Sequence, residues 1–158
     1  KAKGIKVIIT ELSKARKDKA RESGVADYIL DPSEVDVVEE VKKLTNGEGV
    51  DVAFECTSVN KVLDTLVEAC KPTANLVIVS IWSHPATINV HSVVMKELDV
   101  RGTIAYCNDH AETIKLVEEG KIKLIGVNLY PKLEIKKSIV ELYNSDKIKA
   151  VRLAEMFE

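Results

Sequence analysis

The sequence lacks the patterns that mark three common kinds of partner or site. No apolar run approaches the roughly 20 residues of a membrane-spanning helix, so we predict no membrane partner. Basic residues are interleaved with acidic ones and the formal net charge is −2, which gives nucleic-acid binding little support. The cysteines, Cys56, Cys70 and Cys107, form no C-x-x-C pair and have no histidine at metal-ligand spacing. We therefore predict no metal site within this chain.

Candidate catalytic side chains are also scarce. His84, His91 and His110 have no acidic, serine or cysteine partner at a recognisable spacing, so we assign no catalytic residue. An odd number of widely separated cysteines in apolar surroundings predicts reduced, buried thiols rather than disulfides. Such thiols are typical of a reducing compartment, so the sequence predicts a cytoplasmic protein.

A glycine-rich G-x-G-x-x-G turn is absent, although the chain begins with a pattern that normally follows one. The run Val7-Ile8-Ile9 predicts a strand buried on both faces, and Glu11 stands where that strand should end. Ser13 can then cap a helix. In dinucleotide-binding folds, an acid at the end of the second strand follows the turn by about 20 residues. Because the chain starts at Lys1 without an initiator Met, we expect a piece of a longer protein, cut inside its first strand–helix unit.

Glu11 carries the first functional hypothesis. An acid at this position accepts hydrogen bonds from the adenosine ribose hydroxyls and repels a 2′-phosphate, so Glu11 favours NAD over NADP. The alternative is a solvated carboxylate at a helix start, where the helix dipole favours a negative charge. Strand–acid–helix junctions are common among α/β folds, so this stretch alone leaves both interpretations open.

Strands and helices alternate along most of the chain. Apolar runs predict further strands at 26–30, 50–56, 76–81, 100–106 and 127–129. Apolar stripes and capping patterns predict helices that start near residues 14, 33, 57, 109 and 135, with a further helical piece within 88–98. This alternation is typical of right-handed β-α-β units, so we predict an open α/β domain with a mostly parallel sheet. No linker divides the 158 residues into two domains.

Four segments together resemble the medium-chain, zinc-type alcohol dehydrogenases, and within them the 2,3-butanediol and polyol dehydrogenases. They are the first strand with Glu11, Ser13 and Arg16, then A-D-Y-I-L-D-P, then N-G-E-G-V-D-V-A-F-E-C, then V-I-V-S-I-W. The resemblance covers the whole chain and is loose after Pro131. It implies an NAD-binding Rossmann domain joined to an N-terminal catalytic domain that holds the zinc and its ligands. Nothing in this chain matches that catalytic domain.

The resemblance also implies which residues contact the cofactor. At the adenosine end, Glu11 would bind the ribose, and Arg16 would lie near the adenine or the ribose. At the nicotinamide end, the residues would be Cys56, Thr57 and Ser58 after the fourth strand, Val79, Ser80 and Ile81 along the nicotinamide side, and Thr103 and Ala105 facing the carboxamide. Lys149 would lie near the pyrophosphate. Some have simpler interpretations: Arg16 as a solvated helix residue, and Val79 and Ile81 as core strand residues.

The chain departs from the family pattern in three ways. Ser58 stands where many relatives have glycine, which could crowd the cofactor or cap the next helix. The stretch from Gly24 to Asp27 has one residue more than the usual G-A-D. The missing first strand matters most. The sheet order 3-2-1-4-5-6 loses a central strand, and both neighbours of that strand are left with unpaired edges.

Three functions are compatible with these patterns. The first is the cofactor-binding part of an NAD-dependent, zinc-type oxidoreductase that interconverts a secondary alcohol, butanediol or a polyol, and a ketone; the chain by itself is then expected to be inactive. The second is a non-catalytic, self-associating α/β module. The family dimerises through the region that is Thr87 to Arg101 here, with Val93, Val94 and Met95 as apolar positions. The third, a non-NAD nucleotide binder such as a methyltransferase, fits the start of the chain but not V-D-V-A-F-E-C.

Overall fold

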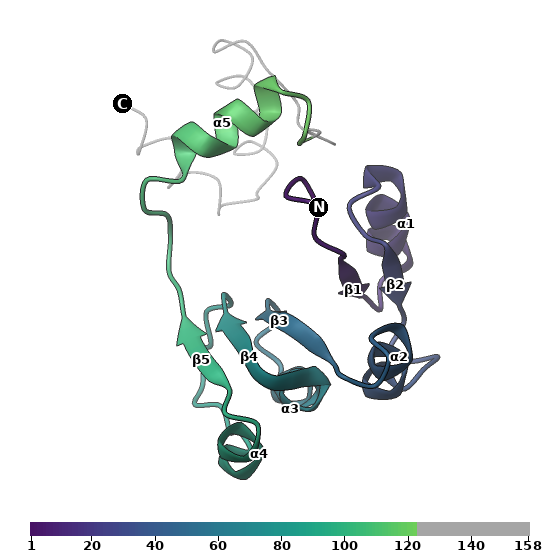
Figure 1. The fold of residues 1–158 in the computed structure, drawn as a ribbon, viewed down its shortest axis with the longest axis vertical. Helices are drawn as coiled ribbons and strands as arrows, with labels where there is room; N and C mark the ends of the chain where they lie inside the picture. Colours follow the sequence, from purple (N-terminus) through teal and green to yellow (C-terminus); the bar gives the residue numbers. More distant parts are fainter. Residues whose placement is uncertain (123–158) are drawn as a thin grey trace, which may run out of the picture. The chain divides into compact units, whose positions relative to one another are not determined.

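The computed structural model describes residues 1–122 of the chain. In chain order its elements are β1 (Ile8–Thr10), α1 (Lys14–Ser23), β2 (Tyr28–Leu30), α2 (Val37–Leu44), β3 (Val50–Glu55), α3 (Asn60–Ala69), β4 (Cys70–Ile78), α4 (Val90–Met95), β5 (Asp99–Gly102) and α5 (His110–Glu118) (Figure 1). None of the helices in this part of the chain is long and apolar enough to cross a membrane. The elements predicted near 127–129 and 135–143, and Lys149, lie outside the described residues.

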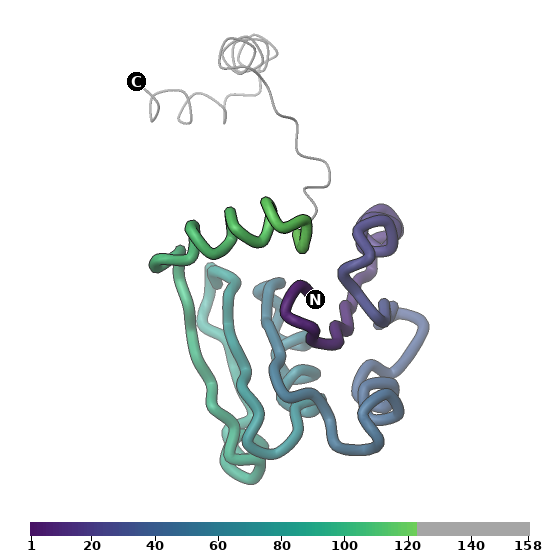
Figure 2. The backbone as a smooth tube through the Cα atoms, turned by 45° about the horizontal axis from the view of Figure 1, so that its top comes forward, coloured from purple at the N-terminus to yellow at the C-terminus, as the bar shows by residue number. Residues whose placement is uncertain are grey.

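The strands form two parallel sheets, as the alternation of strands and helices predicts. β1 pairs with β2 in one sheet, and β4 lies between β3 and β5 in the other. Figure 2 follows the three strands of the second sheet side by side. Parallel neighbours need a crossover connection, and a helix stands between each pair of consecutive strands. The predicted α/β class with parallel strands is confirmed.

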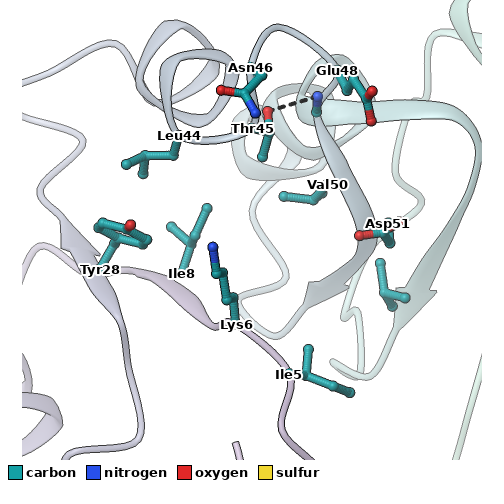
Figure 3. A pocket seen from close by; sticks show the side chains of 12 residues that line it. Ile5, Lys6, Ile8, Tyr28, Leu44, Thr45, Asn46, Glu48, Val50 and Asp51 are labelled. Carbon is teal, nitrogen blue, oxygen red and sulfur yellow. Dashed lines mark hydrogen bonds between the residues drawn. The ribbon is translucent and has the colours of Figure 1, made fainter.

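No strand joins the two sheets within residues 1–122. Among these residues β1 is paired only with β2 and β3 only with β4, so each has an open edge. A pocket of ≈ 370 Å³ lies between the segment leading into β1 and the start of β3 (Figure 3). Its wall combines apolar side chains, such as Ile8 and Val50, with polar ones, such as Lys6 and Asp51. Ile8 and Ile9 are only half-buried, whereas the sequence predicts burial on both faces.

The larger core lies between α3 and the three-stranded sheet. Leu63 and Val67 of α3 pack with Ala53 of β3 and Leu76 of β4, and all four side chains are almost fully buried. A smaller core lies under α2, where Val41 packs with neighbours from α3, β1, β2 and β3. α3 therefore contributes to both clusters, and the larger one holds β3 and β4 in place.

Several predicted boundaries were wrong, among them the start of α2, which is Val37 rather than a residue near 33. α3 begins at Asn60 rather than at Thr57, because the Glu55 carboxylate accepts the main-chain amides after β3 in a non-helical turn. β4 runs from Cys70 to Ile78 rather than over 76–81, because α3 ends at Ala69 and the strand follows it directly. β5 ends at Gly102 instead of continuing to residue 106, because its pairing partner β4 ends at Ile78.

The prediction of buried thiols holds for only one cysteine. Cys70 is buried at the start of β4, and this burial raises the pKa of its thiol. Cys56 and Cys107 are exposed because each follows a strand where the chain has already left the sheet. All three are free thiols.

Candidate functional site

Glu11 follows β1 and its carboxylate is held by two neighbours in sequence. Its main-chain amide donates to the carbonyl of Leu30, 3.0 Å away, which closes the β1–β2 ladder. The Arg16 guanidinium binds the carboxylate through two hydrogen bonds, Nε to Oε2 at 2.6 Å and Nη2 to Oε1 at 2.8 Å. The amide of Ser13 donates to Oε1 at 2.7 Å. These hydrogen bonds, that from Arg16 above all, lower the pKa of Glu11 to about 2. Glu11 is therefore a fixed anion at the end of the strand.

Asp31 occupies the matching position after β2, and sequence reasoning gave it no role. It accepts hydrogen bonds from the Ser33 amide at 2.9 Å and from the Ser33 hydroxyl, and it forms an ion pair with Lys17 of α1. Lys17 and then Ser33 lower the pKa of Asp31 to about 2. The D-P-S sequence after a strand was the available signal, because an aspartate before a turn commonly accepts the amide two residues on. Asp31 therefore ties α1 to the end of β2.

These two acids predict how the fold responds to pH. Their folded pKa values of about 2 lie below the ordinary values of 4.5 and 3.8, so folding favours the ionised forms. Their contribution to stability is fully present above about pH 4.5 and is lost as the pH falls toward 2. Urea unfolding across this range measures the loss. Asp31→Asn should lower stability at neutral pH and flatten the profile, and Glu118→Gln, at an exposed acid of α5, should do neither. An unchanged profile in Asp31→Asn would contradict this account.

Glu55 connects the loops that follow β3 and β4. Its side chain is fully buried. Oε1 accepts the Thr57 amide at 2.6 Å, the Thr57 hydroxyl at 2.7 Å and the Ser58 amide at 3.0 Å. Oε2 accepts the hydroxyl of Ser80. Burial alone would raise the pKa of Glu55, but the hydrogen bonds from Ser80, Thr57 and Ser58 outweigh it and hold the pKa below its ordinary value. Three predicted site residues therefore meet at one buried carboxylate.

Ser58 adds a second link between the two loops. Its hydroxyl donates to the carbonyl of Ile81 at 3.1 Å. Its φ of 58° lies in the left-handed region, which favours glycine over other residues. The prediction that Thr57 and Ser58 begin a helix was wrong, because the N-cap of α3 is Val59. Ser58 joins two loops instead of capping the helix.

The remaining predicted residues lie in or beyond the same strand ends. Cys56 is exposed directly after β3. Val79 and Ile81 follow β4 and are 43% and 81% exposed, so their interpretation as core residues was wrong. Thr103 continues the β4–β5 pairing through a hydrogen bond from its amide to the Ile78 carbonyl at 3.0 Å, and Ala105 is exposed with a φ of 55°.

All of these positions follow the carboxyl ends of parallel strands. In open α/β sheets, ligands bind in the crevice outside those ends. The pocket in Figure 3 is lined by the start of β3 and by the segment before β1, so we do not assign it to a cofactor. Within residues 1–122, no group of three His, Cys, Asp or Glu side chains could hold a metal ion. We therefore assign no zinc ligand to this part of the chain.

The described residues form a Rossmann-type α/β domain of the dinucleotide-binding class. Its parallel strands alternate with helices, an acid follows β1, and polar loops follow β3 and β4. The sequence model described as zinc-binding dehydrogenase matches residues 1–119. The chain thus belongs to the zinc-binding dehydrogenase family. This assignment excludes the methyltransferase-like alternative.

Relatives with assigned activities point the same way. The chain is 98% identical over 124 residues to (R,R)-butanediol dehydrogenase of Neisseria gonorrhoeae, a match that covers 78% of this chain and 35% of that protein. It is 41% identical over 115 residues to the Bacillus subtilis protein of the same name, covering 72% of this chain and 32% of the other. The chain spans about a third of the length of these relatives.

Solved structures agree with the fold. The crystal structure of 2R,3R-butanediol dehydrogenase from B. subtilis superposes with a TM-score of 0.68 at 40% identity and covers 73% of this chain and 33% of that one. A zinc-binding dehydrogenase structure from Sinorhizobium meliloti, bound to NADP, has a TM-score of 0.66 at 27% identity and covers 75% of this chain and 36% of that one.

Proposed function

We propose that this chain is the NAD-binding part of a dehydrogenase that interconverts a secondary alcohol, butanediol or a related polyol, and the corresponding ketone. The near identity to the N. gonorrhoeae enzyme carries this proposal. When bound, NAD accepts hydride from the alcohol carbon. We further propose that residues 1–158 belong to a longer, cytoplasmic enzyme whose zinc ligands lie in other parts of the protein. The exposed free thiols of Cys56 and Cys107 support a reducing compartment.

Glu11 would hold the adenosine end of the cofactor. An ionised carboxylate accepts hydrogen bonds from the 2′- and 3′-hydroxyls of a ribose, and its charge repels a 2′-phosphate. Arg16 already binds both carboxylate oxygens and so fixes the orientation of the acid. This arrangement supports NAD as the cofactor and assigns Arg16 to the support of Glu11.

The loops after β3, β4 and β5 would hold the nicotinamide end. Their polar groups include Thr57 and Ser80, and Val79 and Ile81 supply exposed apolar surface beside them. A flat aromatic ring with a carboxamide needs both kinds of contact, apolar for its faces and polar for its edge. Cys56, Ser58, Thr103 and Ala105 complete the proposed surface.

The intact enzyme would pair with a second copy through residues 87–101. Of the three apolar positions in this segment, Val94 and Met95 of α4 are 65% and 69% exposed, whereas Val93 packs against the larger core. Exposed apolar side chains on one short helix support an interface between identical chains. The same observation supports the alternative function, a non-catalytic self-associating module.

Fluorescence of Trp82 tests the cofactor proposal. Trp82 is the single tryptophan and packs against the larger core just beyond β4. NADH is expected to bind and quench the emission of Trp82. Its affinity should exceed that of NADPH by about tenfold or more, because the Glu11 carboxylate repels the 2′-phosphate. Glu11→Gln should reduce this preference, and Glu22→Gln, an exposed acid on α1, should keep it. The absence of a response to either cofactor, together with sedimentation as a dimer, would favour the self-associating module.

A further inference from the structure

Glu55 is an unusual residue for the core of a sheet. Its side chain is fully buried, and the four groups that hydrogen-bond to it, two amides and two hydroxyls, are all uncharged. Removing a carboxylate from water is costly, and only strong hydrogen bonds offset the cost. A buried charge of this kind is weak evidence for stability, because an apolar residue of similar size is often equally stable. The position of Glu55 therefore indicates another role.

The two oxygens of Glu55 serve different loops. Oε1 takes the donors of Thr57 and Ser58 in the loop after β3, and Oε2 takes the hydroxyl of Ser80 in the loop after β4. The main-chain oxygen of Glu55 also accepts the Val79 amide at 2.9 Å and the Ser80 amide at 3.2 Å. Because a carboxylate is planar and rigid, these contacts fix the position of one loop relative to the other.

We infer that Glu55 is a positioning residue, whose buried carboxylate holds the loops after β3 and β4 in one arrangement. The importance of that arrangement for the cofactor rests on the proposed function, since both loops belong to the proposed nicotinamide surface. Glu55 is too deeply buried to touch the cofactor itself. It acts through Thr57, Ser58 and Ser80, so its loss should leave the core folded and loosen only the two loops.

Glu55→Met tests this role, because methionine has a similar length and no strong acceptor. Amide hydrogen exchange in the whole chain is the first measurement. Exchange at Thr57 and Ser58 is expected to rise about tenfold or more, since both amides lose their acceptor. After correction for any change in global stability, the amides of α3 should exchange as slowly as they do in the unaltered chain. Glu55→Gln should restore slow exchange, because its amide oxygen can accept from Thr57 and Ser58 while its amide nitrogen donates to Ser80.

Val67→Ala is the matched control for a purely structural effect. Val67 is fully buried in the core behind the same sheet, so its truncation lowers stability without touching either loop. The exchange rates of the Thr57 and Ser58 amides are compared after correction for the global stability of each variant. If Val67→Ala then raises them as much as Glu55→Met does, the inference is overturned. It is also overturned if Glu55→Met leaves both amides protected.

Should Glu55→Met fail to fold, Ser80→Ala provides a second test, because it removes only the Oε2 contact. Exchange in the loop after β4 should then become faster; unchanged exchange there would also overturn the inference.

NADH affinity is the second measurement, and it separates the two proposals. Glu55→Met should weaken NADH binding about tenfold, Glu55→Gln should recover most of it, and Val67→Ala should retain it. If the unaltered chain binds no NADH, the proposed function fails, while the exchange data still decide the role of Glu55. If the loops loosen in Glu55→Met but NADH affinity stays the same, the loops are held by Glu55 without serving the cofactor.

Discussion

Gly49→Ala is expected to destabilise the domain by about 3–5 kcal/mol, among the largest effects of a single substitution. Gly49 precedes β3 with a φ of 102°, in the left-handed region. A Cβ at this position would lie 2.6 Å from the Ala69 carbonyl oxygen and 2.8 Å from the Lys71 nitrogen. Both are main-chain atoms at the junction of α3 and β4, so no side chain can move aside to relieve the clash. The junction, and with it the start of β4, would have to shift.

Gly47→Ala provides a matched control in the same turn. Its φ is 90°, but a Cβ there meets nothing within 4 Å, so only the backbone strain of about 1–2 kcal/mol remains. Urea unfolding of the two variants measures the difference. Equal losses of stability would show that the close approach of Gly49 to the α3–β4 junction is unimportant. The turn itself is held by the Thr45 hydroxyl, which accepts the Gly49 amide at 2.9 Å (Figure 3).

Leu76→Ala is expected to cost about 2–5 kcal/mol, because it leaves a cavity at the centre of the larger core. Leu76 is fully buried in β4, with Ala53 of β3 and Val100 of β5 as its neighbours across the sheet. It packs in the cluster that contains Leu63 and Val67 of α3. The side chains of Ala53 and Ala74 in the same cluster are too small to fill the space.

Ile104→Ala serves as the control for Leu76→Ala. Ile104 follows β5 and is 83% exposed, so its truncation should change the free energy of unfolding by no more than about 0.5 kcal/mol. The two variants are compared by urea unfolding. A loss below about 1 kcal/mol for Leu76→Ala would contradict the assignment of this cluster as the main core of the described residues.

The core and the site meet at the ends of β3 and β4. Glu55 follows Ala53 along β3, and Ser80 follows Leu76 along β4, so the packing of the two strands on α3 sets where their loops begin. A cavity in this core should therefore lower the stability of the loops together with that of the whole sheet. Glu55→Met differs in kind, because it removes the carboxylate contacts to both loops and leaves the core packing in place.

The sequence by itself determined the class of the fold. Apolar runs separated by helical stripes and turn residues are local signals, and they correctly predicted parallel α/β units. The acid after the first strand was also evident, because Glu11 directly follows an apolar run. The family followed from short motifs such as G-E-G-V-D-V-A-F-E-C, which need no structure to be read.

Only the tertiary structure decided how the site is assembled. Glu55 and Ser80 are 25 residues apart, and their contact depends on the register of β3 against β4, which sequence patterns do not specify. The same register ends β4 at Ile78 and leaves Val79 and Ile81 exposed rather than in the core. The Lys17–Asp31 ion pair likewise requires α1 to pack beside the end of β2. Such contacts join residues far apart in sequence, so the fold must form before any of them exists.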